Sequence, residues 1–412
     1  MKEQVNTTDK LSAGLRALPK SSKQSFSSTQ AAWRFYNNHR VSLEQLSEPL
    51  LEAAHTGITT QCKQYGLCVH DWSRLNYHNH TSKSDRYQIT HEHDVGYDLQ
   101  SSLMVNDITG QAIAPVAQRL LTKDTSYASY PIQDSKERKS HLDEVTDCIH
   151  WIEKQQFAKP LVHIIDREAD SIAHIRTWEK HGYHWLTRSR MSSTVEYQGV
   201  SMRCSLVVEQ LDFVKSRKVD YKGQKCYQWI ADTPIHITRK SKPSQKKRKQ
   251  ASVAGEPVDA RLVVCQIRNK ENQVVSTWLL ITNVKDVCAD TVALWYYWRW
   301  KIETWFKLLK GAGHNLESWQ QETGQAIAKR LLVVSMACVV VWEIANAKGE
   351  DAERFRDFLI RLSGRQMKHG VAYTNPALLA GLWAFISMLH VLETYSEEEL
   401  DWMKKMFQKI VV

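Results

Sequence analysis

The order of hydrophobic patterns between Tyr65 and Arg190 limits this chain to a small number of folds. The runs YGLCVHDWSRLNYH and YDLQSSLMVNDITGQAIAPVAQRLL are typical of strands, and the NDITG turn within the second predicts a hairpin. A helical pattern at about 140–156, the apolar run PLVHII, a helical pattern through IAHIRTWEKHG and the run YHWLTRSR follow. The prediction is three antiparallel strands, a helix, a parallel strand, a helix and a final strand.

This order is that of a ribonuclease H-like core, so the predicted fold class is α/β. We expect a ribonuclease H-like catalytic core in two parts, 61–190 and 286–345, interrupted by a β-rich insertion at 191–285. Short alternating runs such as STVEYQG, CSLVVEQLDFV and ARLVVCQIRN predict strands throughout the insertion. Helical patterns predict a helical module at 1–60 and a helical C-terminal region at 346–412, where PALLAGLWAFISMLHVL suits either core packing or an oligomer contact.

The charge of the chain favours a polyanionic partner. Its net charge of +10 over 412 residues suits nucleic acid or an anionic membrane surface, and the basic run RKSKPSQKKRKQ suits either a DNA backbone contact or a solvated loop. The most apolar run, LLVVSMACVVVW, is too short to span a bilayer and predicts a buried helix. Eight scattered cysteines without a CxxC pair argue against a zinc site and against a disulfide framework, and fit a reducing cytoplasm.

The segment YYWRWKIETWFKLLKG, residues 296–311, places its single acid, Glu303, among four bases. On one helix, an arc of about 80° would contain Tyr296, Arg299, Glu303, Lys307 and Lys310. The opposite side would carry Trp298, Ile302, Trp305 and Leu309. A solvated amphipathic helix with a Glu303 to Lys307 pair is one interpretation. The other is a carboxylate placed to bind a hard metal ion near phosphates.

Three acids stand where a two-metal phosphoryl-transfer site would need them. Asp71 lies in the first predicted strand, Asp166 ends the strand PLVHII, and Glu303 lies on the helix. The end of a strand beside the start of a helix is where α/β sheets present ligands, and Mg²⁺ prefers oxygen ligands. The alternatives are a half-exposed strand residue for Asp71 and a helix cap for Asp166, with Glu168 and Asp170 as rivals in the same segment.

Tyr296, Arg299, Glu303 and Lys310 match the signature Y-x2-R-x3-E-x6-K. Through it the chain resembles the DDE transposases of the family-four bacterial insertion sequences. The sequence DREAD at 166–170, an acid at Asp71 and a β-rich segment before Glu303 add to the resemblance. It extends from about residue 29 to residue 345, and more loosely to the C-terminus.

The resemblance implies a DDE-type DNA transposase, a nuclease and strand transferase that cuts transposon ends through a hairpin intermediate and joins them to target DNA. Asp71, Asp166 and Glu303 would hold two Mg²⁺ ions, for which Mn²⁺ could substitute. The residues expected to contact DNA are Trp278, Tyr296, Arg299, Lys310, Arg188 and Arg190. The implied partners are double-stranded DNA with terminal inverted repeats, target DNA and a second copy in a synaptic dimer, without a membrane, in the bacterial cytoplasm at the nucleoid.

The family also leaves alternatives open. The stretch before TQAAWRFYNNHR is shorter than the helical DNA-recognition module of family members, which allows a transposition inhibitor that dimerises with transposase but binds transposon ends poorly. A ribonuclease H-like nuclease without strand transfer is a third possibility. Trp278 in STWLLITN is either the base-stacking tryptophan of the insertion or an ordinary strand-core aromatic.

Overall fold

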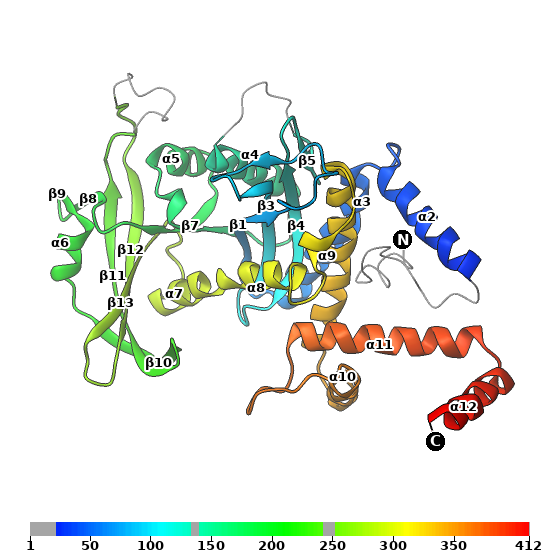
Figure 1. The fold of residues 1–412 in the computed structure, drawn as a ribbon. Helices are drawn as coiled ribbons and strands as arrows, with labels where there is room; N and C mark the ends of the chain where they lie inside the picture. The colour runs from blue at the N-terminus through cyan, green and yellow to red at the C-terminus, as the bar shows by residue number, and fades with distance from the viewer. Residues whose placement is uncertain (1–21, 133–139, 242–251, 412) are drawn as a thin grey trace.

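The computed structural model describes residues 22–132, 140–241 and 252–411. A single 13-stranded sheet runs through this part of the chain, with helices packed around it (Figure 1). Its main path is β5-β4-β3-β1-β6-β7-β13-β12-β11-β8-β9, while β2 pairs with β3 and β10 pairs with β11. The first seven strands are β1 (Gly66–Asn76), β2 (Tyr87–Gln88), β3 (Val95–Asn106), β4 (Ala112–Leu121), β5 (Ser126–Ala128), β6 (Leu161–Ile165) and β7 (His184–Ser189).

The predicted order of elements in the core is confirmed. Strand β1 is antiparallel to β3 and parallel to β6, and β6 is parallel to β7. The NDITG turn joins β3 to β4, with Gly110 in the left-handed region at φ +67°. Helix α4 (His141–Glu153) begins with a capping box at Ser140, and α5 (Ile172–Lys180) leads into β7.

The β-rich segment continues the core sheet, because β13 pairs with β7. Its strands are β8 (Thr194–Tyr197), β9 (Val200–Arg203), β10 (Val214–Tyr221), β11 (Gln224–Ile237), β12 (Val258–Arg268) and β13 (Val274–Thr282). The strand predicted at CSLVVEQLDFV is wrong in its first part, since α6 (Cys204–Glu209) is a helix. Its buried residues, Cys204 and Val207, are three apart, which is a helical spacing. Most of the basic run RKSKPSQKKRKQ lies outside the described residues.

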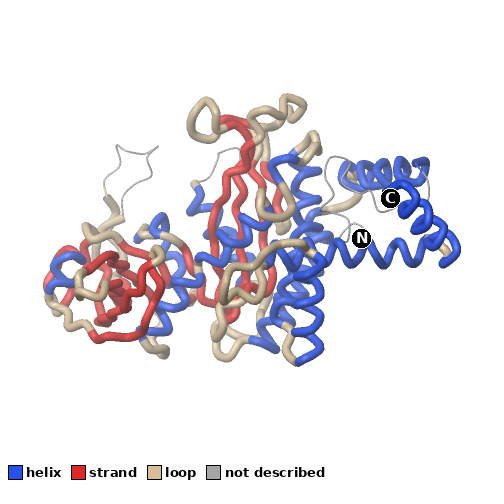
Figure 2. Tube along the Cα trace, turned by 60° about the horizontal axis from the view of Figure 1, so that its bottom comes forward, coloured by secondary structure: helices blue, strands red, loops and turns tan. Residues whose placement is uncertain are grey.

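Helices α3 (Leu43–Gln61) and α9 (Gly324–Asn346) pack against β4 and against each other. The side chain of Ser42 accepts a hydrogen bond from the Gln45 amide and so caps α3. Most of α9 is buried, which confirms a buried helix at LLVVSMACVVVW. Helix α2 (Ser22–Asn37) contacts α9. Figure 2 shows the long helices beside the core strands and the β-rich segment at the other end of the molecule.

The C-terminal region is helical, with α10 (Glu350–Leu362), α11 (Asn375–Thr394) and α12 (Glu397–Val411). Helix α11 packs on α10 and α9. Among the described residues it is the one helix whose length and composition would allow it to cross a membrane, and 22% of its apolar window is buried. Core helices of soluble proteins meet the same criteria.

The segment predicted as one helix at 296–311 forms two. Helix α7 (Ala289–Trp298) ends and α8 (Trp300–Leu309) begins at Arg299, which keeps α-helical angles, so the two lie almost in line (Figure 1). Ile302, Trp305 and Leu309 are buried, as expected for the apolar side. Tyr296 is also buried, although the single-helix prediction places it on the charged face.

Candidate active site

The three predicted carboxylates come from the centre of the sheet and from α8. Asp71 lies in β1, and Asp166 follows the last residue of the neighbouring parallel strand β6. There its side chain accepts a hydrogen bond from the Glu168 amide and caps the short 3-10 helix η1 (Arg167–Ala169). Glu303 lies in the first turn of α8, which packs against β1. The predicted capping role of Asp166 is thus observed, and its charge also affects Asp71.

Arg299 joins two of these carboxylates. Its Nη1 donates to Asp71 Oδ2 at 2.9 Å, and its Nη2 donates to Glu303 Oε1 at 2.6 Å. The side chain of Arg299 is 10% exposed, against 18% for Asp71 and 28% for Glu303. The planar fork of an arginine suits such a double contact, whereas a lysine ammonium would act as a single point charge.

The environment of Asp71 favours its protonated form. Burial raises the pKa of Asp71 from 3.8 to about 6, against the opposing effects of Arg299 and the Trp72 amide. The negative charges of Asp166 and Glu303 raise this pKa further, which places both carboxylates within electrostatic reach of Asp71. A cation among them would relieve this repulsion.

We expect Asp71→Asn to stabilise the protein at pH 7.5 without divalent ions. The pKa of Asp71 is higher in the folded state than in a free aspartate, so between about pH 4 and pH 6 the folded state binds more protons than the unfolded state. The free energy of unfolding of the wild type therefore falls as the pH rises from about 4 to 6. The shift of about two units corresponds to a gain of roughly 2–3 kcal/mol in the free energy of unfolding, which should disappear near pH 3.5. Urea denaturation at both pH values measures this. Lower stability of Asp71→Asn at pH 7.5 would contradict it.

The rival acids of the DREAD segment are engaged elsewhere. The carboxylate of Asp170 accepts hydrogen bonds from Ser189 and Ser193 and pairs with Arg239, so it ties the end of β7 to the β-rich segment. Glu168 lies 3.7 Å from His141, and this interaction lowers the pKa of Glu168. The pKa of His141 rises to about 10 through its hydrogen bonds to Asp98 and Glu168. Of the acids in this segment, Asp166 is the one whose charge affects Asp71.

Tyr296 lies within electrostatic reach of Asp166, and Trp278 and Arg188 lie near Tyr296. The rings of Tyr296 and Trp278 have centroids 6.4 Å apart, and Trp278 is half-buried on β13. Arg188 lies on β7 opposite Leu280 of β13, and both its charge and that of Arg299 affect the Tyr296 hydroxyl. Burial raises the pKa of Tyr296 to about 12, so at neutral pH the hydroxyl remains a hydrogen-bond donor.

Two of the predicted DNA-contacting bases stand apart from this group. Lys310 ends α8, where it lies 3.4 Å from Glu317 and donates to the Arg74 carbonyl of β1. It therefore fastens the end of the helix to the strand that carries Asp71. Arg190 is exposed just beyond β7, and its backbone amide donates to Asp170.

The donor set fits hard divalent cations. Carboxylate oxygens are the ligands that Mg²⁺ prefers, and the guanidinium of Arg299 lies where positive charge is needed between Asp71 and Glu303. The sequence identifies Arg299 but not this bridging contact, because its partner Asp71 is 228 residues away along the chain. The sequence also does not indicate that His141 stacks on Trp72, the neighbour of Asp71, with ring centroids 4.9 Å apart.

Comparison with known proteins gives a matching family and several similar solved structures. The sequence pattern of the family described as "Transposase DDE domain" matches residues 129–340, slightly more than half of the chain, a span that includes Asp166 and Glu303 but not Asp71. The piggyBac transposase, in a cryo-EM structure of its synaptic complex with hairpin DNA, is similar with a TM-score of 0.36 and 9% identity over 97% of this chain and 72% of that chain. No curated protein sequence matches significantly.

Proposed function

The chain belongs to the transposase DDE domain family, and from this premise we propose that it is a cut-and-paste DNA transposase. It would cleave transposon ends by attack of water and then of a 3′-hydroxyl, with a hairpin intermediate, and join the ends to target DNA. The observation that carries the proposal is the Arg299 fork, which joins Asp71 to Glu303, together with the charge of Asp166 within electrostatic reach of Asp71.

We propose that Asp71, Asp166 and Glu303 hold two Mg²⁺ ions, or Mn²⁺ in their place. Such ions would activate the attacking oxygen and stabilise the leaving oxygen of the phosphodiester. The chain supplies the orientation: β1 and β6 fix two of the acids, and Arg299 holds Glu303 toward Asp71. The buried, protonated Tyr296 hydroxyl and the Arg188 guanidinium would donate to DNA phosphate oxygens beside them.

Within the transposase DDE domain family, we propose that the chain is a transposase of the family-four bacterial insertion sequences and that it most resembles the transposase of transposon five. The spacing of Tyr296, Arg299, Glu303 and Lys310 supports it. A ribonuclease H-like core is supported by the strand order β4-β3-β1-β6-β7, in which three antiparallel strands precede two parallel ones.

We also propose that the chain acts as a dimer in a synaptic complex, with the C-terminal helices as the contact. Exposed apolar side chains along α11 and α12 support this: Met388, Leu389, Leu392, Trp402, Met403, Met406, Phe407 and Ile410. Together they give two neighbouring helices an apolar surface of the kind that marks protein interfaces.

The deciding experiment uses the full chain with Mg²⁺ and duplexes that carry the inverted repeats flanking its gene. We expect a 3′ nick, then a hairpin, then joined products in a supercoiled target. Cleavage of branched DNA without end specificity and without strand transfer would favour a ribonuclease H-like nuclease. Absence of any cleavage with Mg²⁺ or Mn²⁺ would contradict the proposed activity.

Replacing Trp278 with Ala should impair the hairpin step more than the first nick. Trp278 is half-buried beside Tyr296, so its ring can serve as a platform for an unstacked base. Loss of one base-aromatic stack costs about 1–3 kcal/mol, or roughly a fivefold to 150-fold reduction in the rate of hairpin formation. Gel analysis of nicked and hairpin products over time measures both steps, with Trp278→Phe as the matched control. An equal loss of both steps together with a lower melting temperature would instead indicate a core aromatic.

A further inference from the structure

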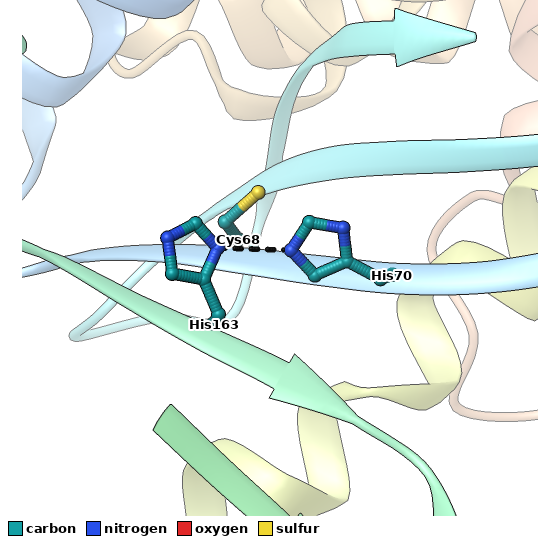
Figure 3. Close-up of side chains that lie close together, drawn as sticks. All are labelled: Cys68, His70 and His163. Carbon is teal, nitrogen blue, oxygen red and sulfur yellow. Dashed lines mark hydrogen bonds between the residues drawn. The ribbon is translucent and has the colours of Figure 1, made fainter. Parts of the chain in front are cut away.

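A second group of metal-ligating side chains lies on the face of β1 opposite Asp71. Cys68 and His70 are two residues apart in β1 and so point to the same side, and Cys68 is the register partner of His163 in the parallel strand β6. One ligand atom from each of the three residues lies within 4.8 Å of the others (Figure 3). Each side chain is at most 1% exposed.

The two histidines are held as metal-bound histidines usually are. His70 Nε2 and His163 Nδ1 face each other at 2.9 Å, the contact drawn dashed in Figure 3. The outer nitrogens are engaged: His163 Nε2 lies 2.9 Å from Glu153 Oε1, and His70 Nδ1 lies 2.8 Å from Ser102 Oγ. A carboxylate or another polar group on the outer nitrogen commonly fixes the orientation of a ligating imidazole.

We propose that Cys68, His70 and His163 form a binding site for a divalent transition metal ion, with Zn²⁺ the preferred ion. Thiolate and imidazole are the ligands that zinc favours, in contrast to the all-oxygen group around Asp71. Tetrahedral coordination at zinc-nitrogen distances of about 2.0–2.1 Å would separate the two nitrogens by roughly 3.3 Å, so the imidazoles need only a small opening. Cys148 of α4 is the candidate for the fourth position, since it interacts electrostatically with Cys68 and lies 3.3 Å from Ser102 Oγ.

The protonation states agree with this site. Burial lowers the pKa of His70 well below its usual value, so the imidazole is already neutral as a ligand must be. Burial raises the pKa of Cys68 well above its usual value, so the thiol would release its proton only on binding the ion. Binding of the ion would free the nitrogens that face each other, because the proton between them can move to His70 Nδ1. From there His70 can donate to the Ser102 hydroxyl, and this hydroxyl can donate to Cys148. Thiolates of Cys68 and Cys148 together would neutralise the charge of Zn²⁺.

The position of this site suggests a structural role. His70 directly precedes Asp71, and His163 lies three residues before Asp166. A metal ion bound here would cross-link β1 and β6 behind the acids that they carry. The suggested role in holding the acids rests on the proposed function, whereas the proposal of a metal site at Cys68, His70 and His163 does not.

Elemental analysis of the full chain, refolded with Zn²⁺ and then dialysed against EDTA, tests the proposal. We expect about one zinc per chain in the wild type and in Asp71→Asn, which removes an acid of the other site. Cys68→Ser and His163→Gln should lose the zinc, while Cys226→Ser, a buried cysteine on β11, should retain it. Loss of the metal in Asp71→Asn with retention in Cys68→Ser would place it at the acids and overturn the proposal.

Cobalt substitution gives a readout in the wild-type protein, and the variant Cys148→Ser then tests the fourth position. Wild-type protein loaded with Co²⁺ should show thiolate-to-cobalt charge transfer and the intense visible bands of a tetrahedral ion, and Cys148→Ser should change the visible bands if Cys148 is the fourth ligand. Folded wild type that binds neither Zn²⁺ nor Co²⁺ in this manner would show that the cluster is a hydrogen-bonded pair of core histidines beside a thiol. DNA cleavage could still be normal in that case, so failure here is distinguishable from failure of the transposase proposal.

Discussion

Glu303→Gln is expected to reduce cleavage of transposon ends by at least about a thousandfold while leaving the fold intact. The glutamine oxygen can still accept from Arg299 Nη2, which donates to Glu303 at 2.6 Å, so the contact survives without its charge. Removing a metal-binding carboxylate forfeits several kcal/mol of transition-state stabilisation, and each 1.36 kcal/mol is a factor of ten in rate. Single-turnover cleavage at saturating Mg²⁺, with DNA binding measured in parallel, checks the expectation.

The same experiment separates the two roles of Asp166. Asparagine caps helices as well as aspartate does, so Asp166→Asn should keep the hydrogen bond from the Glu168 amide and the stability of the protein. If Asp166 is also a metal ligand, cleavage should fall as steeply as in Glu303→Gln. Glu168→Gln is the matched control, because its carboxylate pairs with His141, and it should cleave within about threefold of wild type. Normal cleavage by Asp166→Asn would mean that Asp166 only caps the short helix and does not bind metal.

The sequence predicts those parts of the site that depend on local spacing. The pattern of Tyr296, Arg299, Glu303 and Lys310 lies within sixteen residues, and the apolar run before Asp166 identifies a strand end. Contacts set by strand register could not be predicted in this way, because the partner of a residue is fixed only when the sheet forms. The pairing of Cys68 with His163 is such a contact, and cysteine spacing alone led to the opposite expectation of no zinc site.

A similar limit applies to Arg299. A helical projection places Arg299 on a charged face with Lys310, and phosphate binding by both was the expected consequence. In the structure their partners differ: Arg299 contacts Asp71 and Glu303, whereas Lys310 contacts Glu317 and the Arg74 carbonyl. A helical projection contains no information about β1, which supplies Asp71 as a partner to Arg299 and the Arg74 carbonyl as a partner to Lys310.

Arg299→Gln should therefore destabilise the protein at pH 7.5 by about 3 kcal/mol in the absence of divalent ions. The change removes the cation between Asp71 and Glu303 and leaves two partly buried like charges without compensation, a loss that typically costs 3–5 kcal/mol for fully buried pairs. Arg299→Lys should lie between wild type and Arg299→Gln, because one ammonium cannot reproduce the double contact. Urea denaturation measures the three proteins.

Two treatments should restore the stability of Arg299→Gln, and together they test why the arginine is there. The pKa of Asp71 is already about 6 with Arg299 present, and losing this cation can only raise it, so lowering the pH to 5 should protonate Asp71 and remove the repulsion. Mg²⁺ should act likewise by replacing the lost positive charge, and it should bind the variant more tightly than wild type. Lys310→Gln should change stability by less than about 1 kcal/mol and respond to neither treatment, since its contacts, to Glu317 and the Arg74 carbonyl, do not involve Asp71, Asp166 or Glu303. Equal stability of Arg299→Gln and wild type at pH 7.5 would mean that the guanidinium does not compensate the acids, and the case for a shared cation site at Asp71, Asp166 and Glu303 would lose its main support.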